Sequence, residues 1–122
     1  MIIDEALNSK TVASIYRHYL HAKEKHPYFC DRLMPKISYG EAQQITEDAL
    51  TQVRDNLKLE TSRGSLIWDL ILNCEVWEIH EAIANRDVVR ALEECYDAIA
   101  VLLRVVDVLE GRQKLGRAKE VK

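Results

Sequence analysis

The sequence predicts an all-α fold in which antiparallel helices pack as a four-helix bundle. The 122 residues include only four glycines and two prolines, so few positions interrupt regular structure. Apolar residues recur at helical spacing rather than in alternation, which is typical of amphipathic helices. A chain of this length has room for one modest core. We therefore expect a single all-α domain over residues 1–110, followed by a basic, flexible tail over 111–122.

The first two helices are expected on either side of an irregular segment. The first helix should open at Asn8 or Ser9, since both residue types cap helix N-termini, and end at Lys25. Residues 26–40 contain both prolines and therefore read as a turn and loop. The second helix is expected over 41–61.

The second half of the chain is predicted to be a helical hairpin. Gly64 suits the C-cap of the second helix, and Ser65 suits the N-cap of the third. The third helix is then expected over 66–85. The fourth helix is expected over 88–110. Asp87 should be its N-cap, and Gly111 should end it.

Four acids of this hairpin occur as two pairs, Glu75 with Glu78 and Glu94 with Asp97. A spacing of three residues places both members of a pair on one face of a helix. If the chain reverses at Arg86, Glu75 lies opposite Asp97, because 86 − 75 and 97 − 86 both equal 11. Glu78 lies opposite Glu94 for the same reason, at a separation of 8 from the turn. The hairpin should therefore gather all four acids within about one helical turn, roughly 5 Å.

These acids are expected to point toward the interior of the domain. Glu78 shares its helix face with Ile71 and Cys74, and Glu94 shares its face with Ala98. An ionised carboxylate on a buried face must be paired, protonated or bound to a metal ion.

A divalent cation is the predicted partner of the four acids. Two carboxylates about 5 Å apart repel by roughly 3 kcal/mol at an effective dielectric constant near 20. Arg90 lies one turn before Glu94 and can pair with it, but one arginine cannot neutralise four acids. Hard oxygen ligands favour Mg²⁺ or Mn²⁺ over zinc.

The motifs themselves resemble those of a known family. Residues 75–81 read Glu-Val-Trp-Glu-Ile-His-Glu, and residues 93–97, after a short turn, read Glu-Glu-Cys-Tyr-Asp. They resemble the all-α nucleoside triphosphate pyrophosphohydrolases, whose signature is EExxE followed by ExxD. That group includes MazG-like proteins, dimeric dUTPases, dCTP pyrophosphatases and phosphoribosyl-ATP pyrophosphohydrolases. The similarity covers residues 65–110 and departs at Cys74, which stands where the signature has its first Glu.

This resemblance implies a MazG-type bundle, and the apolar character of the fourth helix predicts that oligomerisation completes it. It also implies a Mg²⁺-dependent hydrolase, with Mn²⁺ as a substitute, that cleaves a (d)NTP to a (d)NMP and pyrophosphate in nucleotide-pool house-cleaning. The predicted catalytic and metal-binding residues are Glu75, Glu78, Glu94 and Asp97. Two alternatives stay open. One is a phosphoribosyl-ATP pyrophosphohydrolase, and the other is a non-catalytic helical module that binds a nucleotide or a partner.

Candidate substrate-binding residues lie at two places in the chain. Lys23, Lys25 and Arg32 flank the first turn and could bind the triphosphate, although a solvated basic loop is an equal alternative. Arg90 is a further candidate because it precedes the second acid pair. Trp77 is a candidate to stack on the nucleobase.

Bulk composition bears on partners and location. The net charge of −3 argues against general nucleic-acid binding. The sequence has no apolar run of 18 residues and no signal peptide, and its three cysteines form no CxxC pair. We therefore expect a cytoplasmic protein without a membrane partner. Between residues 98 and 109, ten of twelve residues are apolar, so the fourth helix needs burial on several sides and predicts a homodimer or homotetramer.

Overall fold

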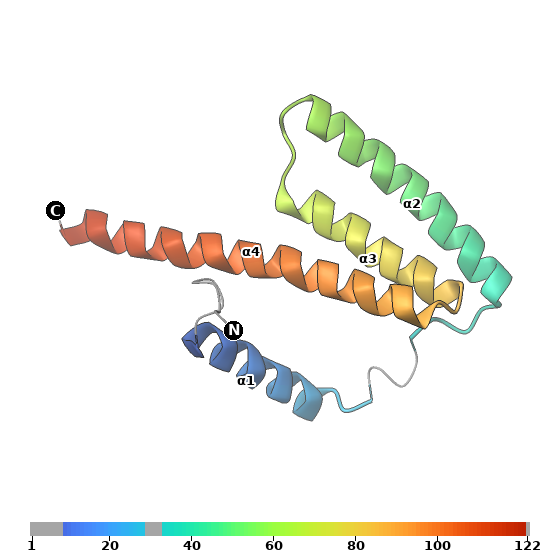
Figure 1. Cartoon of the computed structure of the whole chain (residues 1–122), viewed down its shortest axis with the longest axis horizontal. Coiled ribbons are helices and arrows are strands. Elements are labelled where there is room, and N and C mark those ends of the chain that lie inside the picture. Colours follow the sequence, from blue (N-terminus) through green and yellow to red (C-terminus); the bar gives the residue numbers. More distant parts are fainter. Residues whose placement is uncertain (1–8, 29–32, 122) are drawn as a thin grey trace. The chain divides into compact units, whose positions relative to one another are not determined.

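The structure, a computed structural model, is all-helical over the residues it describes, which are 9–28 and 33–121, with side chains described to residue 111. The helices are α1 (Ser9–Lys25), α2 (Tyr39–Ser62), α3 (Trp68–Ala84) and α4 (Val88–Val121) (Figure 1). The predicted all-α class is therefore confirmed, while the MazG-type bundle stays a prediction. None of the described helices combines the length and apolar character that crossing a bilayer requires.

The chain divides into two compact units. One comprises residues 1–33 and 103–122, and the other comprises residues 34–102. The second unit contains α2, α3 and the first half of α4, and with them all four predicted metal ligands. The single domain predicted over 1–110 and the flexible tail over 111–122 stay predictions.

In the first unit, α1 has the predicted bounds. The helix closes where the His26 amide donates to the Ala22 carbonyl at 2.9 Å, directly before Pro27. Thr11 is buried, and its hydroxyl donates to the Glu110 carboxylate at 3.1 Å, which satisfies a polar group that would otherwise be costly to bury.

α2 begins two residues earlier than predicted because Ser38 caps it. The Ser38 hydroxyl oxygen accepts a hydrogen bond from the Glu41 amide at 3.1 Å, and the hydroxyl lies 3.4 Å from the Glu41 carboxylate. The Ser38 side chain thus satisfies one of the free amides in the first turn of α2. At the other end Arg63 is the C-cap, and Gly64 follows it with a φ of 69°. The predicted C-cap is therefore wrong by one residue: Arg63 is the C-cap, and Gly64 is the left-handed residue that follows it.

The predicted N-cap of the third helix is wrong. Ser65 turns back to α2, where its amide donates to the Glu60 carbonyl at 3.0 Å and its hydroxyl bonds the Glu60 carboxylate. α3 therefore starts at Trp68, with Ile67 in an extended conformation as its N-cap. A serine hydroxyl can satisfy a helix end on either side, and here the preceding C-terminus uses it.

The turn between α3 and α4 lies where the sequence predicted it. Arg86 has a φ of 57°, a left-handed conformation that reverses the chain, and its guanidinium lies 3.7 Å from the centre of the Tyr39 ring. Asp87 caps α4 as predicted, since its carboxylate accepts from the Arg90 amide at 3.1 Å. The predicted end at residue 110 is wrong, because α4 continues through Gly111. A glycine inside a helix is only about 1 kcal/mol less favourable than an alanine. A single glycine is therefore not enough to end a helix.

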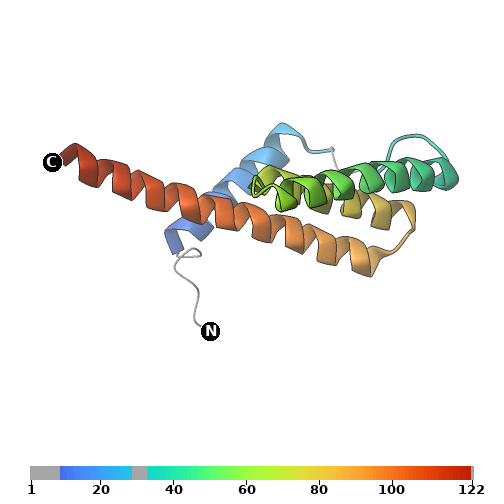
Figure 2. The same ribbon diagram turned by 90° about the horizontal axis from the view of Figure 1, so that it is seen from above.

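The core of the second unit is built from small side chains. In Figures 1 and 2, α2 and α3 run side by side and antiparallel, and the first half of α4 returns along α3. Leu50 is the large residue that α2 buries completely. The other buried apolar residues are Ala42, Cys74, Ala82, Ala84 and Ala98. Small residues let the helix axes approach closely, which brings the polar side chains between α3 and α4 within reach of one another.

Candidate metal centre

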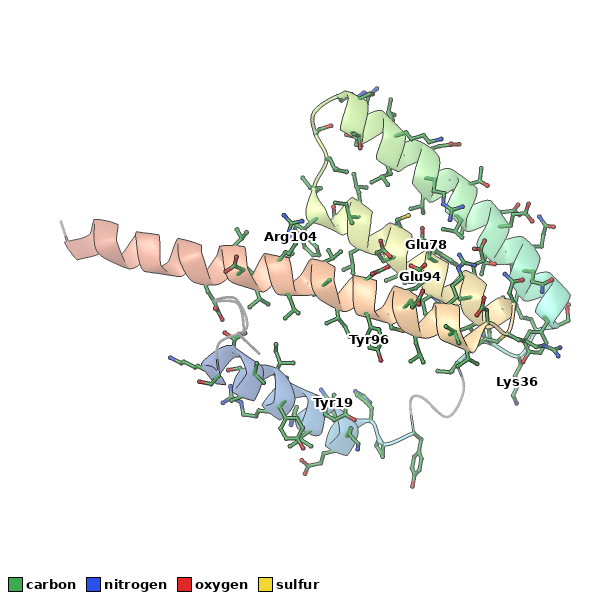
Figure 3. All side chains as sticks on the ribbon, in the orientation of Figure 1. Tyr19, Lys36, Glu78, Glu94, Tyr96 and Arg104 are labelled. Atoms are coloured by element: carbon green, nitrogen blue, oxygen red, sulfur yellow. The ribbon has the colours of Figure 1, made fainter. Side chains whose placement is uncertain are left out.

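Three carboxylates meet between α3 and α4. Glu75, Glu78 and Glu94 each offer one oxygen, and these oxygens lie within 4.8 Å of one another. Figure 3 shows Glu78 and Glu94 in the space between the two helices. All three side chains are partly buried. We call this set the carboxylate group; it contains three of the four predicted ligands.

The fourth predicted ligand, Asp97, is not a member of the carboxylate group. The expectation that it points inward is wrong, because Asp97 is exposed. It has one methylene fewer than a glutamate and lies near the edge of the α4 face that meets α3. Its charge nevertheless acts on the group, since it contributes to raising the pKa of Glu75. Its role as a ligand stays a prediction.

The carboxylate group holds protons in the absence of a cation. Hydrogen bonding to Glu78, burial and hydrogen bonding to Glu75 together raise the pKa of Glu94 to about 8. Burial also raises the pKa of Glu75, helped by the charge of Glu78. Burial pushes the pKa of Glu78 upward as well, but hydrogen bonds from Glu94, Cys74 and Arg54 outweigh it and lower that pKa. At neutral pH, therefore, Glu94 is the protonated member that donates to an ionised Glu78.

Two oxygens of the group are buried without a hydrogen-bond partner among the described residues. They are the Oε2 atoms of Glu75 and Glu94. Buried polar atoms are almost always paired, because an unpaired one loses its hydration without compensation. Glu75, Glu78 and Glu94 would hold a cation through their carboxylate oxygens, and an all-oxygen ligand set suits Mg²⁺ or Mn²⁺. The residues present therefore fit the predicted cation.

Two arginines contact the carboxylate group. Arg90 donates to Glu81 at 2.6 Å, and its Nε lies 4.0 Å from Glu94, so the predicted pairing with Glu94 is the weaker of its two ion pairs. Arg54 reaches across from α2 and lies 3.4 Å from the Glu78 carboxylate. The sequence analysis missed Arg54. The available signal was its position four residues after Leu50, which places it beside the buried stripe of α2.

Cys74, which replaces the first Glu of the family signature, contacts the same carboxylate. Its buried thiol donates to Glu78 Oε1 at 3.5 Å. Burial and the charge of Glu78 raise the pKa of this thiol to about 11, so it is a neutral donor at physiological pH. An ionised glutamate at this place would add repulsion, whereas the neutral thiol adds none.

The remaining candidate residues are Lys23 and Lys25 on α1, Trp77 on α3, and Arg32. Lys23 and Lys25 are exposed on α1, in the first unit, where the Lys23 ammonium lies 5.4 Å from the centre of the Tyr19 ring. Trp77 is partly buried on α3, with its ring 4.9 Å from that of His80. Arg32 lies outside the described residues. Their substrate-binding roles stay predictions.

Comparisons of the chain with protein-family models, with curated proteins and with solved structures give no match. The resemblance to the all-α pyrophosphohydrolases therefore stays a prediction that rests on the motif residues.

Proposed function

We propose that this protein is a Mg²⁺-dependent nucleoside triphosphate pyrophosphohydrolase that cleaves a (d)NTP to a (d)NMP and pyrophosphate, in nucleotide-pool house-cleaning. The observation that carries the proposal is the carboxylate group with its two unpaired buried oxygens, on Glu75 and Glu94. Acids this close repel one another when ionised, and a bound cation would offset that repulsion. The motif resemblance supplies the substrate class.

In this proposal Glu75, Glu78 and Glu94 hold the ion, with Asp97 as a fourth ligand at the rim. Mg²⁺ bound there supplies stabilisation of phosphate charge and a water of lowered pKa. Glu94 must lose its proton to become a ligand, because its raised pKa leaves it protonated at neutral pH. Arg90, held by Glu81, stays beside Glu94 and favours that ionised form.

Glu75 is the proposed general base. Burial raises the pKa of its carboxyl group, which favours proton acceptance, and the oxygen that does not bind the ion would take the proton. Water attacks the α-phosphorus and gives its proton to Glu75. The bond from the α-phosphorus to the bridging oxygen breaks, and pyrophosphate leaves with the bond's electron pair.

We also propose that the protein works as a homodimer or homotetramer. A stripe on α4, defined by Val89, Leu92, Tyr96 and Ile99, has spacings of three and four residues and is at least half exposed at every member. Figure 3 shows Tyr96 pointing away from α3. An exposed apolar stripe of this kind is typical of an interface between subunits.

We propose a cytoplasmic location as well. The free thiols of Cys74 and Cys95 are consistent with a reducing compartment.

Pyrophosphate release tests the proposed activity. The purified protein is incubated with canonical and modified nucleotides and with phosphoribosyl-ATP, in Mg²⁺, in Mn²⁺ and in EDTA. We expect pyrophosphate and a monophosphate with either metal and neither product in EDTA. Glu78→Gln should be inactive, while Glu93→Gln, a change in an exposed acid of α4, should retain activity. A folded protein that releases no pyrophosphate from any nucleotide would contradict the enzymatic proposal and favour a non-catalytic module.

A further inference from the structure

The two arginines beside the carboxylate group differ in how they are held. Arg90 has an anchor outside the group, because its guanidinium donates to Glu81 at 2.6 Å. Its side chain is 35% exposed. A short, charge-assisted bond to a residue that binds no ion keeps Arg90 in place whether or not the carboxylates hold a cation.

Arg54 has no such anchor among the described residues. Its one ion pair there is with Glu78, at 3.4 Å, which is long for a charge-assisted hydrogen bond. Its side chain is 47% exposed, against 20% for Glu78, so the guanidinium stands where the carboxylate group meets solvent. It also shares the Oε1 atom of Glu78 with the Cys74 thiol.

We infer that Arg54 is a phosphate-binding residue of this site, an inference that rests on the proposed function. Its guanidinium pairs with Glu78 when the carboxylates hold no cation, and with a substrate phosphate when they do. An ion bound at Glu78 takes the charge that attracts Arg54 and repels the guanidinium. Because half of the side chain is in solvent, it can turn away without disrupting the core.

The chemistry of the displaced group suits a triphosphate. A guanidinium presents a planar fork of donors that matches two phosphate oxygens, and it stays charged at any physiological pH. A phosphate that reaches Glu78 from solvent would meet the Arg54 guanidinium, because that side chain is 47% exposed beside Glu78. Arg54 would thereby offset the charge of Glu78 when no cation is bound, and bind the phosphate when a cation is bound.

Calorimetric titration separates these two roles without relying on turnover. Wild type, Arg54→Gln and Arg54→Lys are titrated first with MnCl₂ alone and then with inorganic tripolyphosphate in saturating Mg²⁺. Arg63→Gln is the matched control, since Arg63 ends the same helix and pairs only with Glu60 among the described residues. Circular dichroism establishes that each variant is folded.

We expect Arg54→Gln to bind Mn²⁺ at least as tightly as wild type, because a competing cation has been removed. Its affinity for tripolyphosphate should fall about tenfold or more, the usual effect of losing a hydrogen bond to a charged group. The affinity of Arg54→Lys for tripolyphosphate should fall less, because lysine keeps the positive charge but lacks the planar pair of donors of a guanidinium. Arg63→Gln should match wild type in both titrations.

The inference is overturned if the folded Arg54→Gln and Arg54→Lys proteins bind tripolyphosphate as wild type does, or if both lose Mn²⁺ affinity. Arg54 would then only support Glu78, and the proposed function would still stand on wild-type Mn²⁺ binding and pyrophosphate release. Failure of wild type to bind Mn²⁺ would instead remove the proposed function, and this inference with it.

Discussion

Glu78 on α3 and Glu94 on α4 face each other across the hairpin, with carboxylate oxygens within 4.8 Å. Both lie 8 residues from Arg86, since 86 − 78 and 94 − 86 are equal, and Arg86 reverses the chain with a φ of 57°. The hydrogen bond between the two acids raises the pKa of Glu94, and it contributes to the lowering of that of Glu78. Binding of the proposed cation would therefore release a proton, so cation affinity should depend on pH.

The stability of the cation-free protein should fall as the pH rises through the range in which Glu94 titrates. A raised pKa means that the folded state holds its proton while the unfolded state has lost it. The stabilisation is complete below the ordinary pKa of 4.5 and is lost as the pH rises through about 8. Glu94→Gln removes this ionisation, so its free energy of unfolding should change less between pH 5 and 9.

Urea unfolding in EDTA at several pH values measures this difference. Glu93→Gln, which alters an exposed neighbour, should keep the wild-type pH dependence. A Glu94→Gln protein with the same pH dependence as wild type would contradict the assignment of the proton to Glu94.

Mg²⁺ should raise the melting temperature of the wild-type protein by several degrees. An ion that binds only the folded state contributes about 2.7 kcal/mol at a concentration one hundred times its dissociation constant. The shift should grow between pH 6 and pH 9, because protons on Glu94 compete with the ion. Differential scanning calorimetry with and without MgCl₂ checks both statements, and no shift at millimolar Mg²⁺ would argue against the site.

In the proposed oligomer, the apolar stripe on α4 should form the contact between subunits. Leu92→Glu combined with Ile99→Glu places two charges among side chains that are about half exposed in the single chain, so the monomer should tolerate them while the assembly should not. Light scattering after gel filtration should show a smaller particle. Gln52→Glu, on the exposed face of α2, serves as the control that keeps the wild-type mass. An unchanged mass for the double variant would place the interface elsewhere.

The N-cap of α4 should contribute to stability without affecting catalysis. Asp87→Ala removes the acceptor of the Arg90 amide and should lower the free energy of unfolding by about 1 kcal/mol. Chemical denaturation measures the loss, and Asp87→Asn should recover most of it because asparagine also caps helices. Pyrophosphate release per folded protein should stay unchanged, since Asp87 is not a member of the carboxylate group.

Local signals predicted the helices well and their ends less well. The bounds of α1 and the capping role of Asp87 are confirmed because each depends on residues a few positions apart. The expected cap at Ser65 and the expected stop at Gly111 are wrong. Each residue was compatible with two local outcomes: the hydroxyl of Ser65 bonds the end of the preceding helix, and the backbone at Gly111 stays helical.

By itself, the sequence determined which helices form, where the hairpin turns, and that Glu78 meets Glu94, because helical periodicity and the distance from the turn set that register. Only the tertiary structure decided that Arg54 of α2 reaches Glu78 and that Asp97 stays at the rim. It also decided that two glutamate oxygens are buried without a partner among the described residues. These features depend on how closely α2, α3 and α4 approach, which follows from the packing of small residues such as Ala82 and Ala98 and not from any spacing along one helix.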